Sequence, residues 1–176
     1  MQNFLIVVDM QNDFVSGTLG SEMAKNIVPA VVDRVKLAFS NGETVIFTRD
    51  THNEDYLDTL EGKNLPIKHC IKDTFGYQII DELKYYALKS AVIDKPTFGS
   101  EKLATLLKNA NEVEKIESVT LIGLCTDICV ISNAMLIKAS LPDTTIIIEE
   151  NATAGVSEES KQTALSSMRT CQMIVK

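Results

Sequence analysis

The chain of 176 residues has no block of lysine or arginine residues, and its 17 basic side chains are outnumbered by 24 acidic ones. Nucleic-acid-binding surfaces are usually basic, so we expect no nucleic-acid partner. A long apolar run is also missing. The first apolar run, FLIVV at residues 4–8, ends at Asp9 and is too short for a signal peptide or a membrane span. We therefore expect a cytoplasmic protein without a membrane segment.

Cysteine and histidine are scarce, and tryptophan is absent. The cysteines are at positions 70, 125, 129 and 171, and the histidines are at positions 52 and 69. Four scattered cysteines do not form the dense disulfide framework of a small secreted domain, and a reducing compartment favours free thiols.

Short apolar, β-branched runs alternate with helical patterns along the chain. The runs predict strands at residues 4–9, 43–48, 90–94, 118–123, 144–149 and 171–175. The segments between them predict helices near residues 22–40, 76–86, 100–109, 127–140 and 157–170. Most strands are unbroken Val, Ile and Leu runs, as is typical of a parallel sheet that is covered on both faces. We therefore expect an α/β fold over residues 1–176 as one domain, a three-layer α/β/α sandwich with a mostly parallel, Rossmann-like sheet of six strands.

Titratable side chains follow four of the predicted strands. Asp9 ends the first strand, Asp50 follows the second, Lys95 follows the third, and Cys129 comes just after the fourth. Each of them alone is explained equally well by solvation of a strand end. Together they favour a site, because ligands of open α/β sheets bind beyond the carboxyl ends of the strands.

The stretch GLCTDICVISNAM, residues 123–135, contains two cysteines four residues apart. Thr126 is expected to cap the helix that follows, which places Cys129 in its first turn. Free N–H groups and the helix dipole favour a thiolate there, so Cys129 is predicted to be a nucleophile. The backbone N–H groups around Cys125 and Cys129 are then well placed to bind an oxyanion. An inert buried Cys129 and a disulfide between the two cysteines remain alternatives.

The two histidines lie in a long polar segment, residues 50–75, whose length suggests a function. Asp50, His52 and His69 offer one carboxylate and two imidazoles, a set that suits Zn, Fe or Mn with water as a further ligand. Ordinary loop histidines are the alternative. If the histidines bind a metal, the base for Cys129 must be another residue. We expect it to be Asp9, whose pKa burial would raise, with Lys95 holding the Asp9 carboxylate.

Five motifs resemble, in order and spacing, the nicotinamidase/pyrazinamidase branch of the isochorismatase-like cysteine hydrolases. They are VVDMQNDF (7–14), TRDTH (48–52), HC (69–70), DKPTFGS (94–100) and GLCTDICV (123–130). The resemblance covers essentially the whole chain. It implies a catalytic triad of Asp9, Lys95 and Cys129, and a cis peptide at Leu124–Cys125 that directs the N–H groups of Cys125 and Cys129 into an oxyanion hole.

The resemblance also implies that Asp50, His52 and His69 are metal ligands, that the metal contacts the pyridine nitrogen of the substrate, and that Phe14 packs on the substrate. Among the metals that suit these ligands, we expect zinc. Two positions differ from the family pattern. Leu65 and Pro66 stand where many nicotinamidases have a tryptophan. The additional metal ligand is not a histidine, and Glu54, Asp58 or water is expected in its place.

The activity that the resemblance implies is hydrolysis of nicotinamide to nicotinic acid and ammonia through a thioester on Cys129. One alternative is a metal-free cysteine hydrolase of another small amide, such as an N-carbamoyl compound or maleamate. Another is a non-catalytic domain in which Cys125 and Cys129 are a thiol pair. Hydrolysis of isochorismate is disfavoured, because relatives with that activity lack the cysteine. A small amide is the expected partner, and a homo-oligomer is compatible with the sequence.

Overall fold

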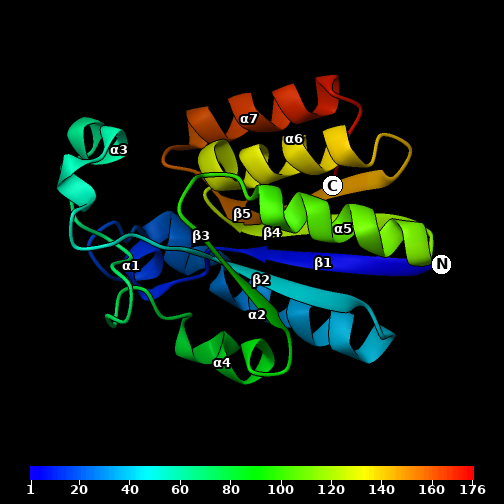
Figure 1. Cartoon of the computed structure of the whole chain (residues 1–176), viewed down its shortest axis with the longest axis horizontal. Helices are drawn as coiled ribbons and strands as arrows, with labels where there is room; N and C mark the ends of the chain where they lie inside the picture. Colours follow the sequence, from blue (N-terminus) through cyan, green and yellow to red (C-terminus); the bar gives the residue numbers. More distant parts are fainter.

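A computed structural model describes residues 1–176 and shows a parallel six-stranded sheet between two layers of helices (Figure 1). The strands are β1 (Gln2–Val8), β2 (Thr44–Asp50), β3 (Ala91–Lys95), β4 (Ile116–Leu124), β5 (Thr145–Ala154) and β6 (Ile174–Val175). Their order in the sheet is β3-β2-β1-β4-β5-β6, and every neighbouring pair is parallel. The predicted α/β sandwich is confirmed.

The longer helices cover both faces of the sheet. Helices α2 (Glu22–Asn41) and α4 (Asp81–Ala87) pack on one face, whereas α5 (Glu101–Val113), α6 (Ile131–Ser140) and α7 (Glu158–Thr170) pack on the other (Figure 1). Shorter helical segments are α1 (Asn12–Val15), η1 (Tyr56–Asp58), α3 (Leu60–Asn64) and the π-helical turn η2 (Thr126–Val130). None of the helices has the length and apolar character needed to cross a membrane.

The central strand β1 shows why the sequence reads as an unbroken apolar run. Leu5 and Val7 belong to the core beneath α2 and α4, whereas Phe4, Ile6 and Val8 belong to the core beneath α5, α6 and α7. Side chains alternate between the two faces of a strand, so a strand that is covered on both faces needs apolar residues at successive positions.

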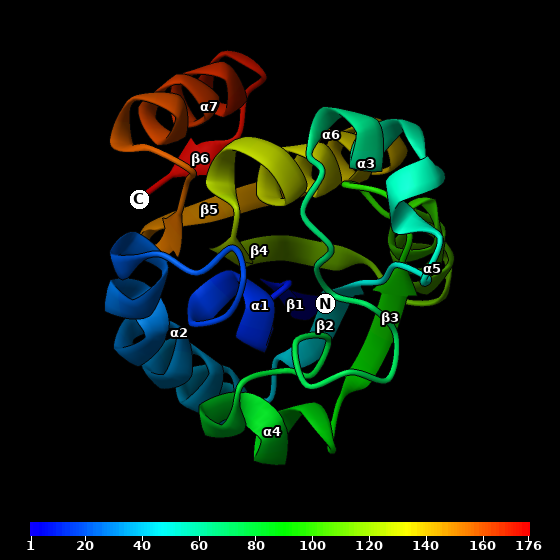
Figure 2. The same ribbon diagram turned by 90° about the vertical axis from the view of Figure 1, so that its left-hand side faces the viewer.

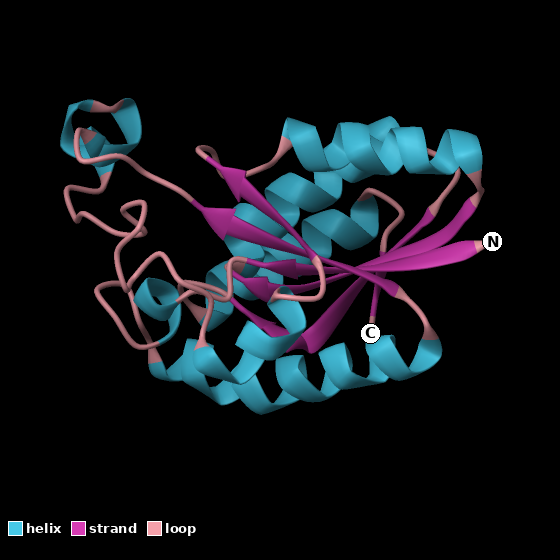
Figure 3. Ribbon diagram, turned by 60° about the horizontal axis from the view of Figure 1, so that its bottom comes forward, coloured by secondary structure: helices cyan, strands magenta, loops and turns pink.

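Two parts of the predicted helix pattern are wrong. Residues 50–75 are expected to be a loop but contain η1 and α3, and no helix is expected at α1, because helices of three to five residues are too short to show a helical period. The helix expected from residue 76 begins at Asp81. Residues 76–80 are instead hydrogen-bonded to residues 10–13, with Ile80 N–H donating to the Met10 carbonyl at 3.0 Å. Helix α3 and its flanking loops extend beyond one end of the sheet (Figure 3).

Gly123 allows β4 to lie beside β1. Its φ of 108° is in the left-handed region, and a Cβ at this position would lie 2.1 Å from the carbonyl oxygen of Val8. Gly42 ends α2 with a φ of 69°, but no atom lies within 4 Å of the position of a Cβ there. A side chain at position 42 would thus cause backbone strain only, whereas a side chain at position 123 would cause both backbone strain and a steric clash.

We expect Gly42→Ala to lower the free energy of unfolding by about 1 kcal/mol, the cost of a left-handed alanine. Gly123→Ala should lower it by at least about 3 kcal/mol, because the clash with Val8 adds to the backbone strain. Urea unfolding of both variants measures the difference, and equal losses would contradict the assignment of the clash.

Candidate active site

The carboxyl ends of four adjacent strands bring the predicted residues together. Asp9 directly follows β1, Asp50 ends β2, Lys95 ends β3, and Cys129 lies in η2 just after β4. Figure 2 shows this end of the sheet, with α1 and α3 in front of it. The site is therefore assembled from segments that are far apart in the sequence.

Lys95 lies between Asp9 and Cys129. Its Nζ is 2.6 Å from Asp9 Oδ2 and 3.4 Å from Cys129 Sγ. The exposed fractions of the three residues are 0% for Asp9, 1% for Lys95 and 5% for Cys129. Thr48 Oγ1 donates a hydrogen bond of 2.6 Å to Asp9 Oδ1, and Lys95 Nζ donates one of 3.1 Å to the Thr97 carbonyl. The cluster is thus buried and held from several sides.

Burial dominates the electrostatics of the cluster. It raises the pKa of Asp9, although the Lys95 ammonium opposes the shift. Burial and the Asp9 carboxylate raise the pKa of the Cys129 thiol well above its ordinary value. Burial disfavours the charged Lys95, but Asp9, Cys129 and Asp50 together raise its pKa. Lys95 is therefore a permanent cation next to a protonated thiol.

The prediction that the helix terminus would make Cys129 a thiolate is not supported. Burial and the Asp9 carboxylate raise the pKa of the Cys129 thiol more than the Lys95 ammonium lowers it. Cys129 therefore needs a base to accept its proton, and Asp9 is the carboxylate on the other side of Lys95.

The prediction that Thr126 caps the helix is also wrong. The cap residue is Cys125, which has an extended backbone, and Thr126 is the first residue of the turn. Thr126 Oγ1 is buried and has no hydrogen-bond partner. The Val130 N–H bonds to the Cys125 carbonyl at 2.9 Å, five residues back, as in a π-helix. This wider turn begins one residue earlier than the expected α-helix.

Cys125 has the geometry that the resemblance implies. The peptide bond between Leu124 and Cys125 is cis. The Cys125 N–H donates no hydrogen bond within the chain, and Cys125 and Cys129 line the same cavity. All four cysteines are free thiols, so the two cysteines do not form a disulfide.

Asp50, His52 and His69 meet as predicted, and Glu61 joins them. One ligand atom from each of the four residues lies within 4.8 Å of the others. Asp50 Oδ2 is 2.9 Å from His52 Nε2 and 3.4 Å from His69 Nε2, and Glu61 Oε1 is 3.5 Å from His52 Nε2. His69 Nδ1 bonds to the carbonyl of Ile67 at 2.8 Å, which leaves Nε2 facing the other ligands.

This donor set fits a divalent metal ion. Two imidazoles and two carboxylates suit a borderline cation, and a backbone carbonyl on the second nitrogen is the usual way to orient a metal-binding histidine. Burial opposes the ionised form of Asp50, but hydrogen bonds with His52 and His69 and the charge of Lys95 lower its pKa below the ordinary value. Asp50 therefore offers a carboxylate at neutral pH.

Glu61 was missed by the sequence reasoning, which expected Glu54, Asp58 or water. Glu54 is exposed and pairs with Lys68 at 2.9 Å, and Asp58 is also exposed. Glu61 faces inward because η1 and α3 turn the chain, with Thr59 Oγ1 accepting the N–H of Gly62. Thr59 is a recognisable cap residue, but a helix of five residues has no periodicity that would orient Glu61.

Two polar residues of the first motif, Gln11 and Asp13, also have structural partners. Gln11 is buried and binds both the N–H of Asp50 (2.7 Å) and its carbonyl (2.9 Å). Asp13 Oδ2 accepts the N–H of Cys70, the residue after His69, at 2.8 Å. Gln11 and Asp13 therefore fix the backbone next to two of the donor residues, a role that the sequence reasoning did not assign.

A cavity of about 340 Å³ lies between two groups of residues. One is the cluster of Asp9, Lys95 and Cys129, here called the cysteine cluster. The other is the donor set, which consists of Asp50, His52, Glu61 and His69. The volume of this cavity is within the usual range for small-molecule sites, about 300 to 1,000 Å³. Its lining combines Cys125 and Cys129 with Asp50, Glu61 and His69. Its apolar side chains include Phe14, Leu65, Phe98, Ile128 and Val156. The Phe14 and His69 rings are 5.6 Å apart and tilted, so the predicted aromatic residue does face the cavity.

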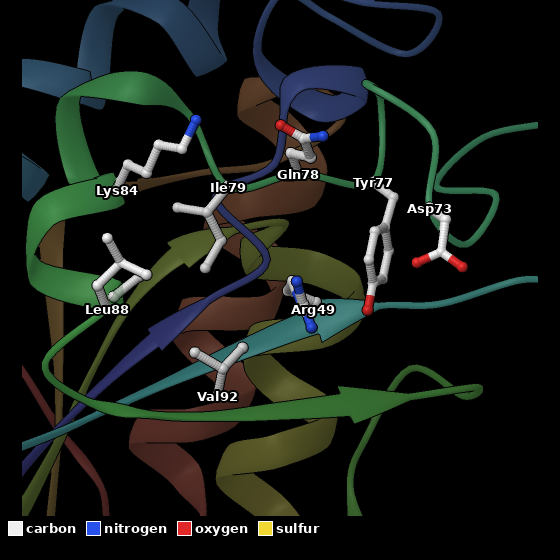
Figure 4. A pocket seen from close by; sticks show the side chains of 9 residues that line it. Arg49, Asp73, Tyr77, Gln78, Ile79, Lys84, Leu88 and Val92 are labelled. Atoms are coloured by element: carbon white, nitrogen blue, oxygen red, sulfur yellow. The ribbon is translucent and has the colours of Figure 1, made fainter.

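A larger hollow of about 510 Å³ lies elsewhere, between α4 and the edge of the sheet (Figure 4). Arg49 there stacks on the Tyr77 ring at 4.2 Å and pairs with Asp94 at 2.7 Å. None of the clustered catalytic candidates or donor residues lines it. Size alone therefore does not identify the site.

Comparison with known proteins places this geometry in a family. The family described as "Isochorismatase domain" matches residues 3–176, so the chain belongs to the isochorismatase family. The uncharacterized isochorismatase family protein PncA of Bacillus subtilis is 30% identical, over 94% of this chain and 93% of that protein.

Two solved structures define the relationship further. The pyrazinamidase/nicotinamidase of Streptococcus mutans UA159 has a TM-score of 0.86 and 27% identity, and the match covers 99% of this chain and 100% of that chain. The N-carbamoylsarcosine amidase of Thermoplasma acidophilum has a TM-score of 0.80 and 28% identity, covering 100% and 96%. The chain is a nicotinamidase-like hydrolase.

We expect Glu61→Gln to lower the affinity for Zn²⁺ by at least about tenfold, because the side chain keeps its shape but loses the charge of a ligand. Glu54→Gln is the matched control and should bind Zn²⁺ as the unchanged chain does. Competition with a chromophoric chelator measures both. Equal affinities for the two variants would remove Glu61 from the donor set.

Proposed function

We propose that this chain hydrolyses nicotinamide to nicotinic acid and ammonia, with Cys129 as the nucleophile. The observation that carries the proposal is that one small cavity is lined both by Cys129 and by Asp50, Glu61 and His69 of the donor set. A substrate in this cavity meets a thiol for attack on its carboxamide and a donor set for recognition of its ring.

In the first step, Asp9 accepts the proton of the Cys129 thiol while Sγ attacks the carboxamide carbon. The raised pKa of Asp9 suits a base that must later return the proton. Lys95 keeps its charge beside both groups and stabilises the sulfur as it loses its proton. The negative oxygen that forms is bound by the backbone N–H groups of Cys125 and Cys129.

In the second step, the tetrahedral adduct collapses. Asp9 gives its proton to the amide nitrogen, ammonia leaves, and a thioester on Cys129 remains. A water molecule then attacks the thioester carbon and gives a proton to Asp9. Collapse of this second adduct releases the carboxylic acid, which ionises to the carboxylate, and the Cys129 sulfur takes back the proton from Asp9.

Asp50, His52, Glu61 and His69 would hold a divalent ion, for which zinc is the first candidate and iron and manganese are alternatives. When bound, the ion would supply a Lewis acid for the ring nitrogen of the substrate. Phe14 contributes an aromatic wall next to His69 and packs on the substrate ring.

We expect Cys129→Ala to lower the rate of ammonia release from nicotinamide by at least about 1,000-fold, because the cavity offers no nucleophile in an equivalent position. Cys171→Ser is the control, since Cys171 is exposed at the end of α7 and is not among the residues that line the cavity. It should retain full activity. The metal content of each sample is measured alongside, and turnover by Cys129→Ala close to that of the control would rule out the covalent route.

A second candidate substrate is a small N-carbamoyl compound. Leu65 lines the cavity where many nicotinamidases have a tryptophan, which leaves less aromatic surface for a pyridine ring. The N-carbamoylsarcosine amidase of Thermoplasma acidophilum also shares the fold at 28% identity. If N-carbamoylglycine is hydrolysed with a higher kcat/KM than nicotinamide and chelation does not affect the rate, this second candidate replaces the first.

A further inference from the structure

The side chain of Asn133 joins the two segments that carry the cysteine and the lysine. Asn133 lies in α6, one helical turn after Cys129, and is completely buried. Its Nδ2 donates to the Cys129 carbonyl at 2.8 Å and to the Phe98 carbonyl at 3.3 Å, and its Oδ1 accepts the N–H of Ser100 at 3.0 Å. The three hydrogen bonds of this buried amide therefore connect α6 to residues 98–100 specifically.

The segment after β3, residues 96–100, supplies one of the hydrogen-bond partners of the Lys95 ammonium. Its Thr97 carbonyl accepts a hydrogen bond from Lys95 Nζ at 3.1 Å, and its Phe98 lines the cavity. Gly99 lies close to α6, because a Cβ there would be 2.7 Å from Leu136 Cδ1. A shift of this segment relative to α6 would therefore move the ammonium relative to the thiol.

The sheet alone does not fix the distance between Lys95 and Cys129. Lys95 ends β3 and Cys129 follows β4, and these strands are separated in the sheet by β2 and β1. No ladder of hydrogen bonds connects them. The path from the Cys129 carbonyl through Asn133 to the Phe98 carbonyl is a direct connection between the two ends.

We infer that Asn133 is a positioning residue, which acts through Lys95 by holding the ammonium beside Cys129 Sγ. Its catalytic consequence rests on the proposed function, but the positioning does not, since it can be read from the reactivity of the thiol alone. The Lys95 charge favours the thiolate, so displacement of the ammonium makes Cys129 less reactive.

The test measures alkylation of the full-length chain by iodoacetamide, with mass spectrometry of each cysteine-containing peptide. The exposed Cys171 is an internal reference, so the result is the ratio of the Cys129 rate to the Cys171 rate. We expect this ratio to fall by at least about fivefold in Asn133→Ala, because the link is lost completely.

Asn133→Ser is designed to keep the hydrogen bond to the Cys129 carbonyl and to lose the bond to the Phe98 carbonyl. Serine can bond to the carbonyl four residues back, as Ser132 Oγ does with the Ile128 carbonyl at 2.6 Å, but it is too short to reach the Phe98 carbonyl. We expect the same fall in the ratio as for Asn133→Ala. This variant decides the question if Asn133→Ala does not fold.

Ser132→Ala is the matched control. It removes a bond within the same helical turn, but the Ser132 side chain makes no hydrogen bond to residues 96–100. Its ratio should change by less than about twofold. An unchanged ratio in folded Asn133→Ser, or an equal fall in Ser132→Ala, would overturn the inference.

A combination with Lys95→Met tests whether Asn133 acts through the lysine. In the Lys95→Met background, adding Asn133→Ser should change the alkylation ratio by less than about twofold. If the two substitutions acted independently, the double variant would show the product of the two separate falls. A full additional fall would show that Asn133 has only a structural role. If the ratio falls as expected but the unchanged chain releases no ammonia from nicotinamide, the substrate assignment fails and the positioning role stands.

Discussion

The buried ammonium of Lys95 is the interaction on which the rest of the site depends. It lies 2.6 Å from Asp9 and 3.4 Å from Asp50, so it balances two buried carboxylates. Buried charges are tolerated only when they are paired, and the loss of one partner leaves the other uncompensated. Asp50 in turn touches both histidines of the donor set. The cysteine cluster and the donor set are thus one electrostatic unit with a shared cation.

The backbone around this unit is held by polar side chains from the N-terminal segment. Gln11 binds both peptide groups of Asp50, and Asp13 binds the N–H beside His69. Asp9 and Cys70 are held with φ values of 48° and 46°, which are unusual for residues other than glycine. Such conformations persist where the surroundings enforce them, as they do at functional sites. The first fourteen residues therefore shape both halves of the cavity.

Much of this architecture could be predicted, because strands and strand ends leave strong signals. Apolar runs located the strands, and the rule that ligands bind at their carboxyl ends brought Asp9, Lys95 and Cys129 together. Glu61 could not be found, since its direction depends on a helix of five residues. The protonation state of Cys129 was also beyond sequence reasoning. A helix terminus near Cys129 can be predicted from the local sequence. The burial that raises the pKa of the thiol depends on the whole tertiary structure.

The order of the strands has a consequence for how the site comes into existence. The central strand β1 is made first, but its neighbour β4 pairs with it through residues as distant as Gln2 and Ile116. Pairing of such distant segments requires closure of a long loop, which carries an entropic cost and slows folding. A nascent or truncated chain that lacks β4 contains the aspartates and the lysine but no aligned thiol. The site is therefore assembled only in a chain that includes β4 and the turn after it, and shorter chains lack the nucleophile.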